Sequence, residues 1–336
     1  MKPDDSTFES ARLTRRNFLF AAPALLMAPR LLGQEEFEPA IRTRRLNNVM
    51  IAVSDMQRSV DFYQKLFGAP IQQGDFAIFR LEQKPAFFGI TQSKVGAKPD
   101  FLSFGLTVEN FYPNQLMKIL ADLGAKNPQV TLRDGTPEVF AGDPDGIRFQ
   151  LQDVAYAHGG GPLGAVLPPQ SKAPPKGVFQ LQSVSHVTLT ITDGQRTEKF
   201  YQDAFSLPVQ VRQGAATTCY AVGSGPDCIV FSPSANNPNA TPGINHACFT
   251  IENFEPNRVM GILEDNGLTP IEYGIASQIK PMTCRLRLRQ RGNNGGGPSS
   301  PMGTPELYFN DPDNIAMQLQ DVSYCGGSGA LGQICP

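Results

Sequence analysis

The chain of 336 residues contains no Trp and only three His, and none of its six Cys lies before Cys219. No Cys-x-x-Cys pair is present, so the spacing that a zinc ribbon needs is missing. Neither positive nor negative charge is in large excess, because the formal net charge is −2, and only 18% of the residues are charged. This balance argues against the broad basic surface on which general nucleic-acid binding depends.

Motifs of several common enzyme classes are absent as well. The sequence has no Walker loop, no Rossmann glycine fingerprint and no G-x-S-x-G elbow. The stretches GSGPD and GGGPLG do not open predicted helices, so they are not expected to bind phosphate. The 29 Pro and 32 Gly instead indicate many turns and few long helices.

After the N-terminal segment, no hydrophobic run approaches the roughly 18 residues of a membrane-spanning helix. Near the start, Arg15 and Arg16 precede an apolar stretch at 18–27 that is too short to span a bilayer. The run TRRNFL resembles a twin-arginine signal, with a basic membrane-surface helix as the alternative. The resemblance implies a signal peptide at 1–33, cleaved between 28 and 34. It also implies passage through the twin-arginine translocase to the periplasm or another exported location, with any cofactor already inserted.

The cysteines leave two disulfide pairings open if the chain reaches an oxidising compartment. Cys325 and Cys335 flank a Gly-rich tail and would close it. Cys219 and Cys228 would face each other across a hairpin that turns at 223–225. Isolated thiols are the alternative for each pair.

Internal similarity shows that the chain holds two copies of one unit. TVENFYPNQLM from Thr107 matches TIENFEPNRVM from Thr250, a spacing of 143 residues. TPEVFAGDPDGIRFQLQDVAY from Thr136 matches TPELYFNDPDNIAMQLQDVSY from Thr304, a spacing of 168 residues. The larger spacing predicts an insertion in the second copy, placed around residues 284–303.

Each copy is predicted to contain two similar strand and helix sets. Alternating apolar residues at 49–53 and 187–191 predict a first strand, and helical spacing follows at 60–66. A second set carries helices near 113–123 and 256–266, each ended by a Gly. Each copy is therefore expected to fold as βαβββ twice, which belongs to the α+β class.

The family pattern in both copies is V-x-[LI]-x-V-x-D, then Phe-Tyr, then GDPDGIRFQL or NDPDNIAMQL. This pattern resembles the vicinal oxygen chelate superfamily, which includes glyoxalase I, bleomycin-resistance proteins and extradiol ring-cleaving dioxygenases. The resemblance implies two tandem domains, each of paired βαβββ modules that form a curved sheet around a pocket. Its predicted parts are the first copy (44–155), a Gly/Pro-rich linker (156–181), the second copy (182–325) and a Gly-rich tail (326–336).

Two of the three His occupy corresponding places near the start of predicted strands, His186 in SHVTL and His246 in NHACF. Because strand side chains face one side at every second residue, both imidazoles can face one cavity. Neutral imidazole is a strong ligand for Fe, Mn, Zn and Ni. The first copy has Asn48 and Ser103 at these places. The alternative is that the second copy has lost metal binding too. The third histidine, His158, lies in the linker and is expected to be solvated.

The resemblance implies Gln318 as a third ligand, on the last strand of the second copy. The superfamily usually has Glu there, and an amide oxygen brings no charge to the ion. Metal affinity is therefore expected to be weak, and a bidentate anion such as an enolate, catecholate or carboxylate would be favoured as substrate. The expected cofactor is a divalent metal, Fe(II) or Mn(II) first, with Zn or Ni as alternatives.

Three functions remain open. An extradiol-type dioxygenase is favoured because Tyr308, a candidate catalytic hydroxyl, lies ten residues before Gln318 as that group requires. Against it, the carboxylate ligand is missing and Ser232 stands where an acid–base His is expected. A glyoxalase-like lyase or isomerase would need a carboxylate base, and the nearest, Glu306, has the counterpart Glu138 in the first copy, which suggests a structural role. A non-catalytic small-molecule binding protein of the bleomycin-resistance type is the third alternative.

A basic stretch in the second copy allows two interpretations. Every second residue is an Arg, so one strand face carries four guanidinium groups, Arg285, Arg287, Arg289 and Arg291. The face is either a solvated side of a long hairpin or a basic lip that steers an anionic substrate or contacts another subunit.

Overall fold

The computed structural model describes residues 39–83, 85–133, 135–154, 156, 176–213, 217–234, 241–289 and 304–324. Pro39–Pro336 forms one compact unit. The predicted signal peptide, most of the predicted linker and the predicted tail lie outside the described residues, as do His158, Arg291, Cys325 and Cys335. No helix in the described part of the chain is long and apolar enough to cross a membrane.

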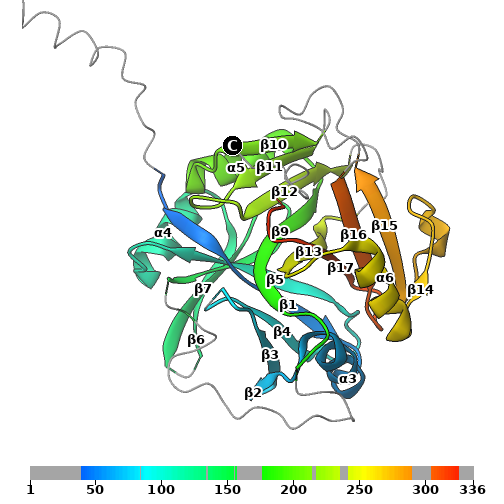
Figure 1. Ribbon diagram of the computed structural model, residues 1–336. Coiled ribbons are helices and arrows are strands. Elements are labelled where there is room, and N and C mark those ends of the chain that lie inside the picture. The colour runs from blue at the N-terminus through cyan, green and yellow to red at the C-terminus, as the bar shows by residue number, and fades with distance from the viewer. Residues whose placement is uncertain are drawn as a thin grey trace, which may run out of the picture. The chain divides into compact units, whose positions relative to one another are not determined.

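The first copy forms a curved sheet of eight strands over its described residues, in the order β2-β3-β4-β1-β5-β8-β7-β6 (Figure 1). Its elements are β1 (Thr43–Val53), α3 (Met56–Phe67), β2 (Ile71–Gln73), β3 (Phe76–Arg80), β4 (Phe87–Gln92), β5 (Asp100–Val108), α4 (Pro113–Asp122), β6 (Lys126–Arg133), β7 (Thr136–Gly142) and β8 (Arg148–Asp153).

The second copy repeats this order with one extra short strand, β10-β11-β12-β9-β13-β17-β16-β15-β14. Its elements are β9 (Leu181–Ile191), α5 (Gly194–Phe205), β10 (Val209–Gln213), β11 (Thr217–Ala221), β12 (Cys228–Pro233), β13 (Gly243–Ile251), α6 (Pro256–Asp265), β14 (Thr269–Pro270), the 3-10 helix η3 (Ala276–Gln278), β15 (Thr283–Arg289), β16 (Thr304–Asn310) and β17 (Ala316–Asp321).

Pairing of the strands confirms the predicted βαβββ sets and the α+β class. The first strand of each set runs parallel to its last strand, as β1 does with β4 and β5 does with β8. The two sets of one sheet meet through an antiparallel pair, β1 with β5 or β9 with β13. The helices predicted near 113–123 and 256–266 are α4 and α6.

The first helix of each copy begins at an Asp that caps it. Asp55 accepts a hydrogen bond from the backbone N–H of Arg58, and Asp193 accepts one from Arg196. Such a cap satisfies one of the N–H groups that the first helical turn leaves unpaired. Apolar side chains on one helix face, such as Tyr63, are then buried against the sheet.

The two sheets share one hydrophobic core. Rings from both copies meet in it: Phe88 lies 5.4 Å from Phe249, and Phe149 lies 6.0 Å from Phe205, both between ring centroids. Contacts of this kind add specific ring geometry to the burial of apolar area. The copies are therefore packed against each other and not only joined by the chain.

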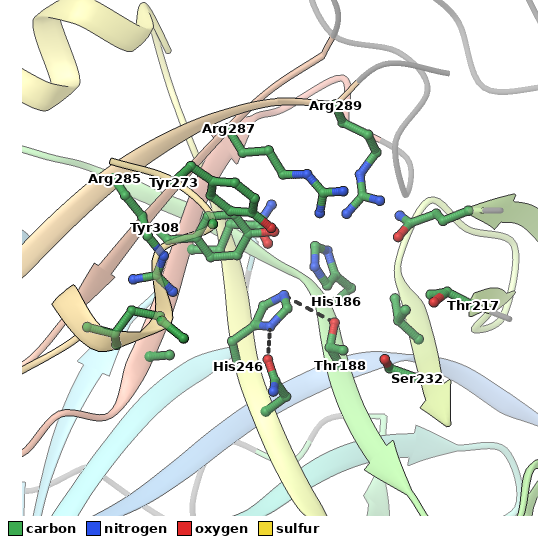
Figure 2. A pocket seen from close by; sticks show the side chains of 18 of the residues that line it. His186, Thr188, Thr217, Ser232, His246, Tyr273, Arg285, Arg287, Arg289 and Tyr308 are labelled. Atoms are coloured by element: carbon green, nitrogen blue, oxygen red, sulfur yellow. Dashed lines mark hydrogen bonds between the residues drawn. The ribbon is translucent and has the colours of Figure 1, made fainter. Parts of the chain in front are cut away.

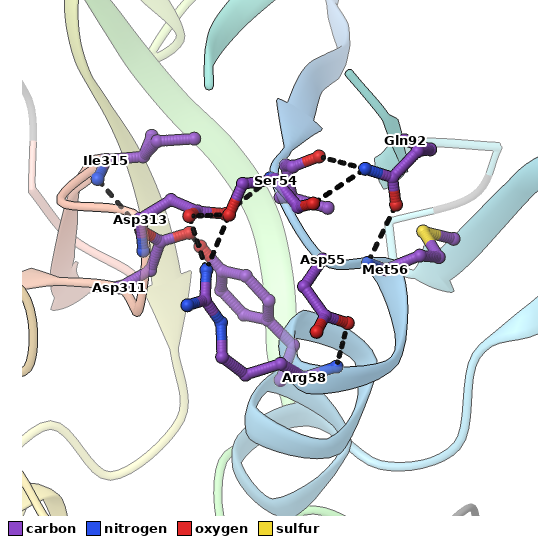
Figure 3. Close-up of polar contacts among 10 residues, drawn as sticks. Ser54, Asp55, Met56, Arg58, Gln92, Asp311, Asp313 and Ile315 are labelled. Carbon is purple, nitrogen blue, oxygen red and sulfur yellow. Dashed lines mark hydrogen bonds and ion pairs between the residues drawn. The ribbon is translucent and has the colours of Figure 1, made fainter. Parts of the chain in front are cut away.

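Two reciprocal sets of polar contacts, made by Asp313 and Asp145 and called the locks below, join the copies at the Asp-Pro-Asp turns. Asp313 of the second copy accepts hydrogen bonds from the backbone N–H (2.8 Å) and hydroxyl (2.5 Å) of Ser54, and pairs with Arg58 (Figure 3). Asp145 of the first copy repeats these contacts on the second copy, where it accepts from the backbone N–H of Thr192 (2.9 Å) and pairs with Arg196. Each turn thus holds the start of the other copy's helix.

The predicted insertion is divided into two pieces, which corrects the expectation of one insertion at 284–303. Arg133 and Arg289 pair with the first residue of the next strand in their hairpins, so they correspond, at a spacing of 156 residues. The spacing therefore grows once before β15 and again after it. The first piece lies within 269–282, and the second lies at 290–303, outside the described residues.

Candidate metal and anion pocket

A cavity of about 470 Å³ opens on the concave side of the second sheet (Figure 2). Its lining comprises His186, Thr188, Gln213, Thr217, Val230, Ser232, Asn245, His246, Tyr273, Gly274, Ala276, Ile279, Arg285, Arg287, Arg289, Tyr308, Ala316, Gln318 and Tyr324. All four residues singled out from the sequence as ligands or catalytic group are in this set, so the fold brings them together.

Strand register explains this convergence. His186 on β9 is paired with Cys248 on β13, which is paired with Gln318 on β17, which is paired with Tyr308 on β16. Paired residues on neighbouring strands face the same side of a sheet, and His246 lies two residues before Cys248, on that same side. The pocket is therefore a row of side chains across four adjacent strands.

The two imidazoles face each other across the pocket floor (Figure 2). Their ring centroids are 5.5 Å apart, and the ring planes are inclined by 82°. Both residues are buried. Burial lowers the pKa of His186 to about 4 and lowers that of His246 well below its usual range, with the nearby Arg289 acting in the same direction. Both rings are therefore neutral near pH 7, which is the form that binds metal.

The orientation of His246 is fixed by its neighbours. Nδ1 lies 2.8 Å from Oδ1 of Asn245, and because an amide oxygen only accepts, Nδ1 carries the hydrogen. Nε2 then accepts a hydrogen bond from the hydroxyl of Thr188 at 3.1 Å. An acceptor such as Asn245 sets the tautomer and ring angle of a metal-binding imidazole, whereas the Thr188 hydroxyl occupies the Nε2 lone pair that an ion would need. The first copy has Leu102 and Met50 at the matching positions, which cannot do this.

Gln318 lies close to both imidazoles with its amide unsatisfied. The side chain is fully buried and close enough to raise the pKa of both rings slightly, but neither amide atom makes a regular hydrogen bond with any described residue. Gln320, on the same face of β17, is in the same condition. Each buried polar group left unpaired costs about 1–3 kcal/mol, so this part of the pocket has the chemistry of a site that takes up a polar species.

The first copy handles the matching amides differently. Asn48 donates from one amide nitrogen to Oε1 of both Gln150 and Gln152, at 3.3 Å each, and Gln152 donates to Asn47 at 2.6 Å. Within the described part of the chain, Oδ1 of Asn48 has no hydrogen-bond partner. An amide network thus occupies the space where the second copy has its imidazoles.

The donor set fits a divalent ion in type but not in charge. Among the described residues no three of His, Cys, Asp and Glu are grouped to hold a metal. The available donors are the two neutral imidazoles and the amide oxygen of Gln318. Nitrogen and oxygen donors of this kind suit Mn, Fe, Zn or Ni, and the unsatisfied amide gives the ion a place, but no donor offsets its charge.

Tyr308 packs its ring edge against His246, with centroids 5.3 Å apart. Its hydroxyl donates to Oε2 of Glu306 at 3.0 Å. Burial first, and then the Glu306 carboxylate, raise the pKa of Tyr308 well above its usual range, so the phenol keeps its proton. Tyr308 is therefore a proton-bearing group beside the candidate ligand His246.

Glu306 is a structural carboxylate and not a pocket base. It is fully buried and accepts hydrogen bonds from Arg289 (2.5 Å) and the Tyr324 hydroxyl (3.0 Å) as well as from Tyr308. Glu138 in the first copy makes the same contacts with the corresponding Arg and Tyr. The shared structural role expected from the repeat is thus observed.

Three of the four alternating arginines line the pocket, so the solvated-face interpretation does not apply to them. Arg285 is 8% exposed, lies over the Tyr308 ring at 5.2 Å and donates to Oδ1 of Asn310 at 2.6 Å. It makes no ion pair with a carboxylate in the described part of the chain. Arg287 lies 5.1 Å above the Tyr273 ring and 3.6 Å from Glu306.

Sequence analysis did not identify several residues that line the pocket or contact its imidazoles. Tyr273, Ala276 and Ile279 come from the first piece of the insertion, which has no counterpart in the first copy to compare with. Asn245 carried a signal, since it precedes His246 directly and replaces an apolar residue of the first copy. Cys219 and Cys228 lie on β11 and β12 without a disulfide, joined by a hydrogen bond between their thiols.

Residues 45–97 match the Glyoxalase/Bleomycin resistance protein/Dioxygenase superfamily. This match lies within the first copy, which lacks both imidazoles. No curated protein matches the chain.

Solved structures match nearly the whole fold. One is a Mn(II)-bound glyoxalase from Novosphingobium aromaticivorans, 16% identical, covering 83% of this chain and 82% of its own at a TM-score of 0.56. A homoprotocatechuate 2,3-dioxygenase from Arthrobacter globiformis is 16% identical, covering 89% and 85% at 0.58. The Brevibacterium fuscum enzyme, in complex with 3,4-dihydroxyphenylacetate, is 17% identical, covering 89% and 87% at 0.56. At these identities the similarity shows the fold, two curved sheets of this type, and no more.

Proposed function

We propose that this protein is a metal-dependent oxidoreductase of the extradiol dioxygenase type. Its second copy would bind a divalent ion through His186, His246 and Gln318 and act on a small, anionic, chelating substrate. The observation that carries the proposal is the pair of neutral imidazoles lining one cavity, with an unsatisfied amide close to both.

The reaction type draws on the solved structures and on Tyr308. Two of the three structures above are homoprotocatechuate 2,3-dioxygenases, and the third carries Mn(II). Mn(II) or Fe(II) is accordingly the proposed ion, with Zn or Ni as alternatives. A bound ion of this kind would act as a Lewis acid toward the chelating oxygens of a catecholate or enolate.

The chain's own residues would perform the remaining tasks. Asn245 orients His246 through Nδ1, and the Thr188 hydroxyl would leave Nε2 when an ion binds there. Arg285 and Arg287 attract the negative substrate, and Tyr308 holds a proton at its phenol oxygen beside His246. The insertion segment adds Tyr273, Ala276 and Ile279 to the lining of the pocket. Serine at position 232 is in the lining where an acid–base imidazole would help the reaction, so turnover is expected to be slow.

A non-catalytic anion-binding protein is the second candidate. It is favoured by the arginines of the lining and by the missing carboxylate ligand. The glyoxalase-like lyase is less favoured, because Glu306 is held by Arg289 and two Tyr hydroxyls and is not available as a base.

Metal analysis combined with turnover tests the proposal. The protein is loaded anaerobically with Fe(II) or Mn(II), its metal content is measured, and oxygen uptake is followed with a panel of catechols beside a lyase assay with hemithioacetals. A His186→Ala/His246→Ala variant is the control, and it is expected to retain under about a tenth of the metal. Equal metal in both proteins would refute the metal site, whereas ligand stabilisation without turnover would support the binding protein.

We further propose export through the twin-arginine translocase, based on TRRNFL near the N-terminus. Replacing Arg15 and Arg16 with Lys is expected to shift the protein from the exported to the cytoplasmic fraction. An unchanged distribution would refute this route.

A further inference from the structure

The pocket carries an excess of positive charge before any ion binds. Three guanidinium groups, Arg285, Arg287 and Arg289, line it, and no Asp or Glu is in its described lining. Among the described residues, the carboxylate that pairs with these groups is Glu306, at 2.5 Å from Arg289 and 3.6 Å from Arg287. Arg285 has no carboxylate partner among the described residues.

A divalent ion would enter this surplus without any anionic ligand from the protein. Imidazoles bind metal in their neutral form, and Gln318 contributes only an amide oxygen. Like charges repel more strongly in a buried pocket than in water, because the effective dielectric is lower. An ion entering alone is thus opposed by the same guanidinium groups that would attract an anion.

Arg285 and Arg287 are present in the copy that has the imidazoles and are replaced in the other copy. Arg285 and Arg287 pair with Tyr308 and Glu306 across their hairpin, as Gln129 and Thr131 do with the matching residues of the first copy. The copy without imidazoles thus has neutral side chains at both places. At these two positions guanidinium groups are present only in the copy that has the imidazoles, which points to one shared ligand system.

We propose that metal and anionic substrate load this pocket together, each raising the affinity of the other. This inference rests on the proposed function and deepens it. The favoured ligand is a dianion with two chelating oxygens, whose charge offsets the ion and reaches Arg285. By thermodynamic linkage, the factor by which the anion tightens the metal equals the factor by which the metal tightens the anion.

The inference makes a prediction whose sign changes with the presence of the anion. Arg285→Gln removes a repulsive charge, so Mn(II) alone is expected to bind about 3- to 10-fold more tightly than to the wild type. The same substitution removes an attraction for the anion, so the gain in Mn(II) affinity from oxalate is expected to fall. We expect that gain to be at least about 10-fold in the wild type and under about 3-fold in the variant.

Equilibrium dialysis of the full chain with Mn(II) measures both quantities, because free Mn(II) and its oxalate complex equalise across the membrane. Titrations are run without anion, with oxalate, and with acetate as a monodentate anion that is expected to give little gain. Arg148→Gln is the matched control, since Arg148 also lies over an aromatic ring, Phe140 at 4.0 Å, but in the first copy. This control should leave both quantities unchanged.

The outcomes separate this inference from the proposed function. Equal Mn(II) affinity with and without oxalate, or an Arg285→Gln variant that weakens Mn(II) in both conditions, would overturn joint loading while leaving the metal site standing. Absence of Mn(II) binding in every condition, with no difference from His186→Ala/His246→Ala, would instead remove the metal site itself. Circular dichroism melts check folding, and Arg287→Gln at the more exposed neighbouring position repeats the test if Arg285→Gln unfolds.

Discussion

The two copies share their framework and differ in their pockets. Both hold a buried Glu between an Arg and a Tyr, and both use an Asp-Pro-Asp turn to anchor the other copy. The pocket positions that differ include Asn48/His186, Ser103/His246, Gln129/Arg285, Thr131/Arg287 and Phe140/Tyr308. The residues that hold the fold together are therefore shared by both copies, whereas the imidazoles and the arginines of β15 are found in one copy.

The first copy also has less space for a ligand. Its corresponding cavity is about 230 Å³, roughly half the volume of the pocket in the second copy. The Arg148 guanidinium lies over the Phe140 ring there, where the second copy has only the methyl group of Ala316. Met50 and Phe87 are buried in an apolar cluster on this side of the sheet. Filling by larger side chains, together with the amide network, makes this copy a scaffold.

Copying the first copy's residues into the second should have the largest effect. In a His186→Asn/His246→Ser variant, we expect metal affinity to fall at least about 100-fold, because both nitrogen donors are lost. The stability of the fold should change far less, since the first copy is folded with these residues. Calorimetric metal titration beside a thermal melt checks both. Unchanged metal affinity would show that the copies do not differ in the way described.

The locks test the symmetric part of the comparison. Asp313→Ala removes two hydrogen bonds to Ser54 and the pair with Arg58, and we expect it to lower the free energy of unfolding by roughly 2–3 kcal/mol, discounting the exposed Arg58. Asp145→Ala should cost a similar amount. Urea unfolding measures both, and Asp122→Ala, at an exposed helical pair, should give no measurable change. A large difference between the two lock variants would contradict the symmetry.

A buried carboxyl at the contact between the copies gives a pH-dependent difference. Asp227, 4% exposed, accepts from the backbone N–H of Leu46 at 3.2 Å, while the first copy has Ala86 at the matching place. Burial raises the pKa of Asp227 from 3.8 to about 7. Its contribution to stability is therefore full below pH 3.8 and is lost as the pH rises through about 7.

Asp227→Asn should remove this dependence. We expect the advantage of the variant over the wild type in free energy of unfolding to grow by about 2–3 kcal/mol between about pH 5 and pH 8. Urea unfolding across that range measures the difference, which cancels the titration of other groups. A constant difference would show that the carboxyl titrates normally.

The smallest effect is expected from the residue that orients His246. Asn245→Leu introduces the residue of the first copy, Leu102, and should lower metal affinity about 10-fold by releasing the imidazole tautomer. Nitrogen NMR of the imidazole in the metal-free protein gives an independent readout, since the hydrogen should no longer be confined to Nδ1. An unaltered tautomer would assign its control to another group.

The repeat made much of this architecture predictable. Matching segments identified the βαβββ sets, and the rarity of His drew attention to His186 and His246. The alternation of side chains along β9 and β13 then predicts that both imidazoles face the same side of the sheet. Gln318 and Tyr308 followed from the family pattern on the last two strands.

Other features could not be read from the sequence, for physical reasons. Alternation placed the arginines of β15 on one face but did not say whether that face meets solvent or the pocket. The answer depends on how the sheet curves. The first insertion piece, with Tyr273, has no counterpart in the first copy, so similarity could not locate it. The contact between Asn245 and His246 depends on side-chain rotation, which a residue pattern does not contain.

The reciprocal anchoring explains why a copy without imidazoles remains in the chain. If the first copy were deleted, the turn before β17 would lose Ser54 and Arg58, and the Asp311 carboxyl would lose the phenol of Tyr63, which now donates to it at 3.0 Å. That same turn sets the start of the strand that bears Gln318. Selection that preserves the second copy would therefore also preserve the first, and imidazoles can be lost from one duplicate far more easily than the duplicate itself.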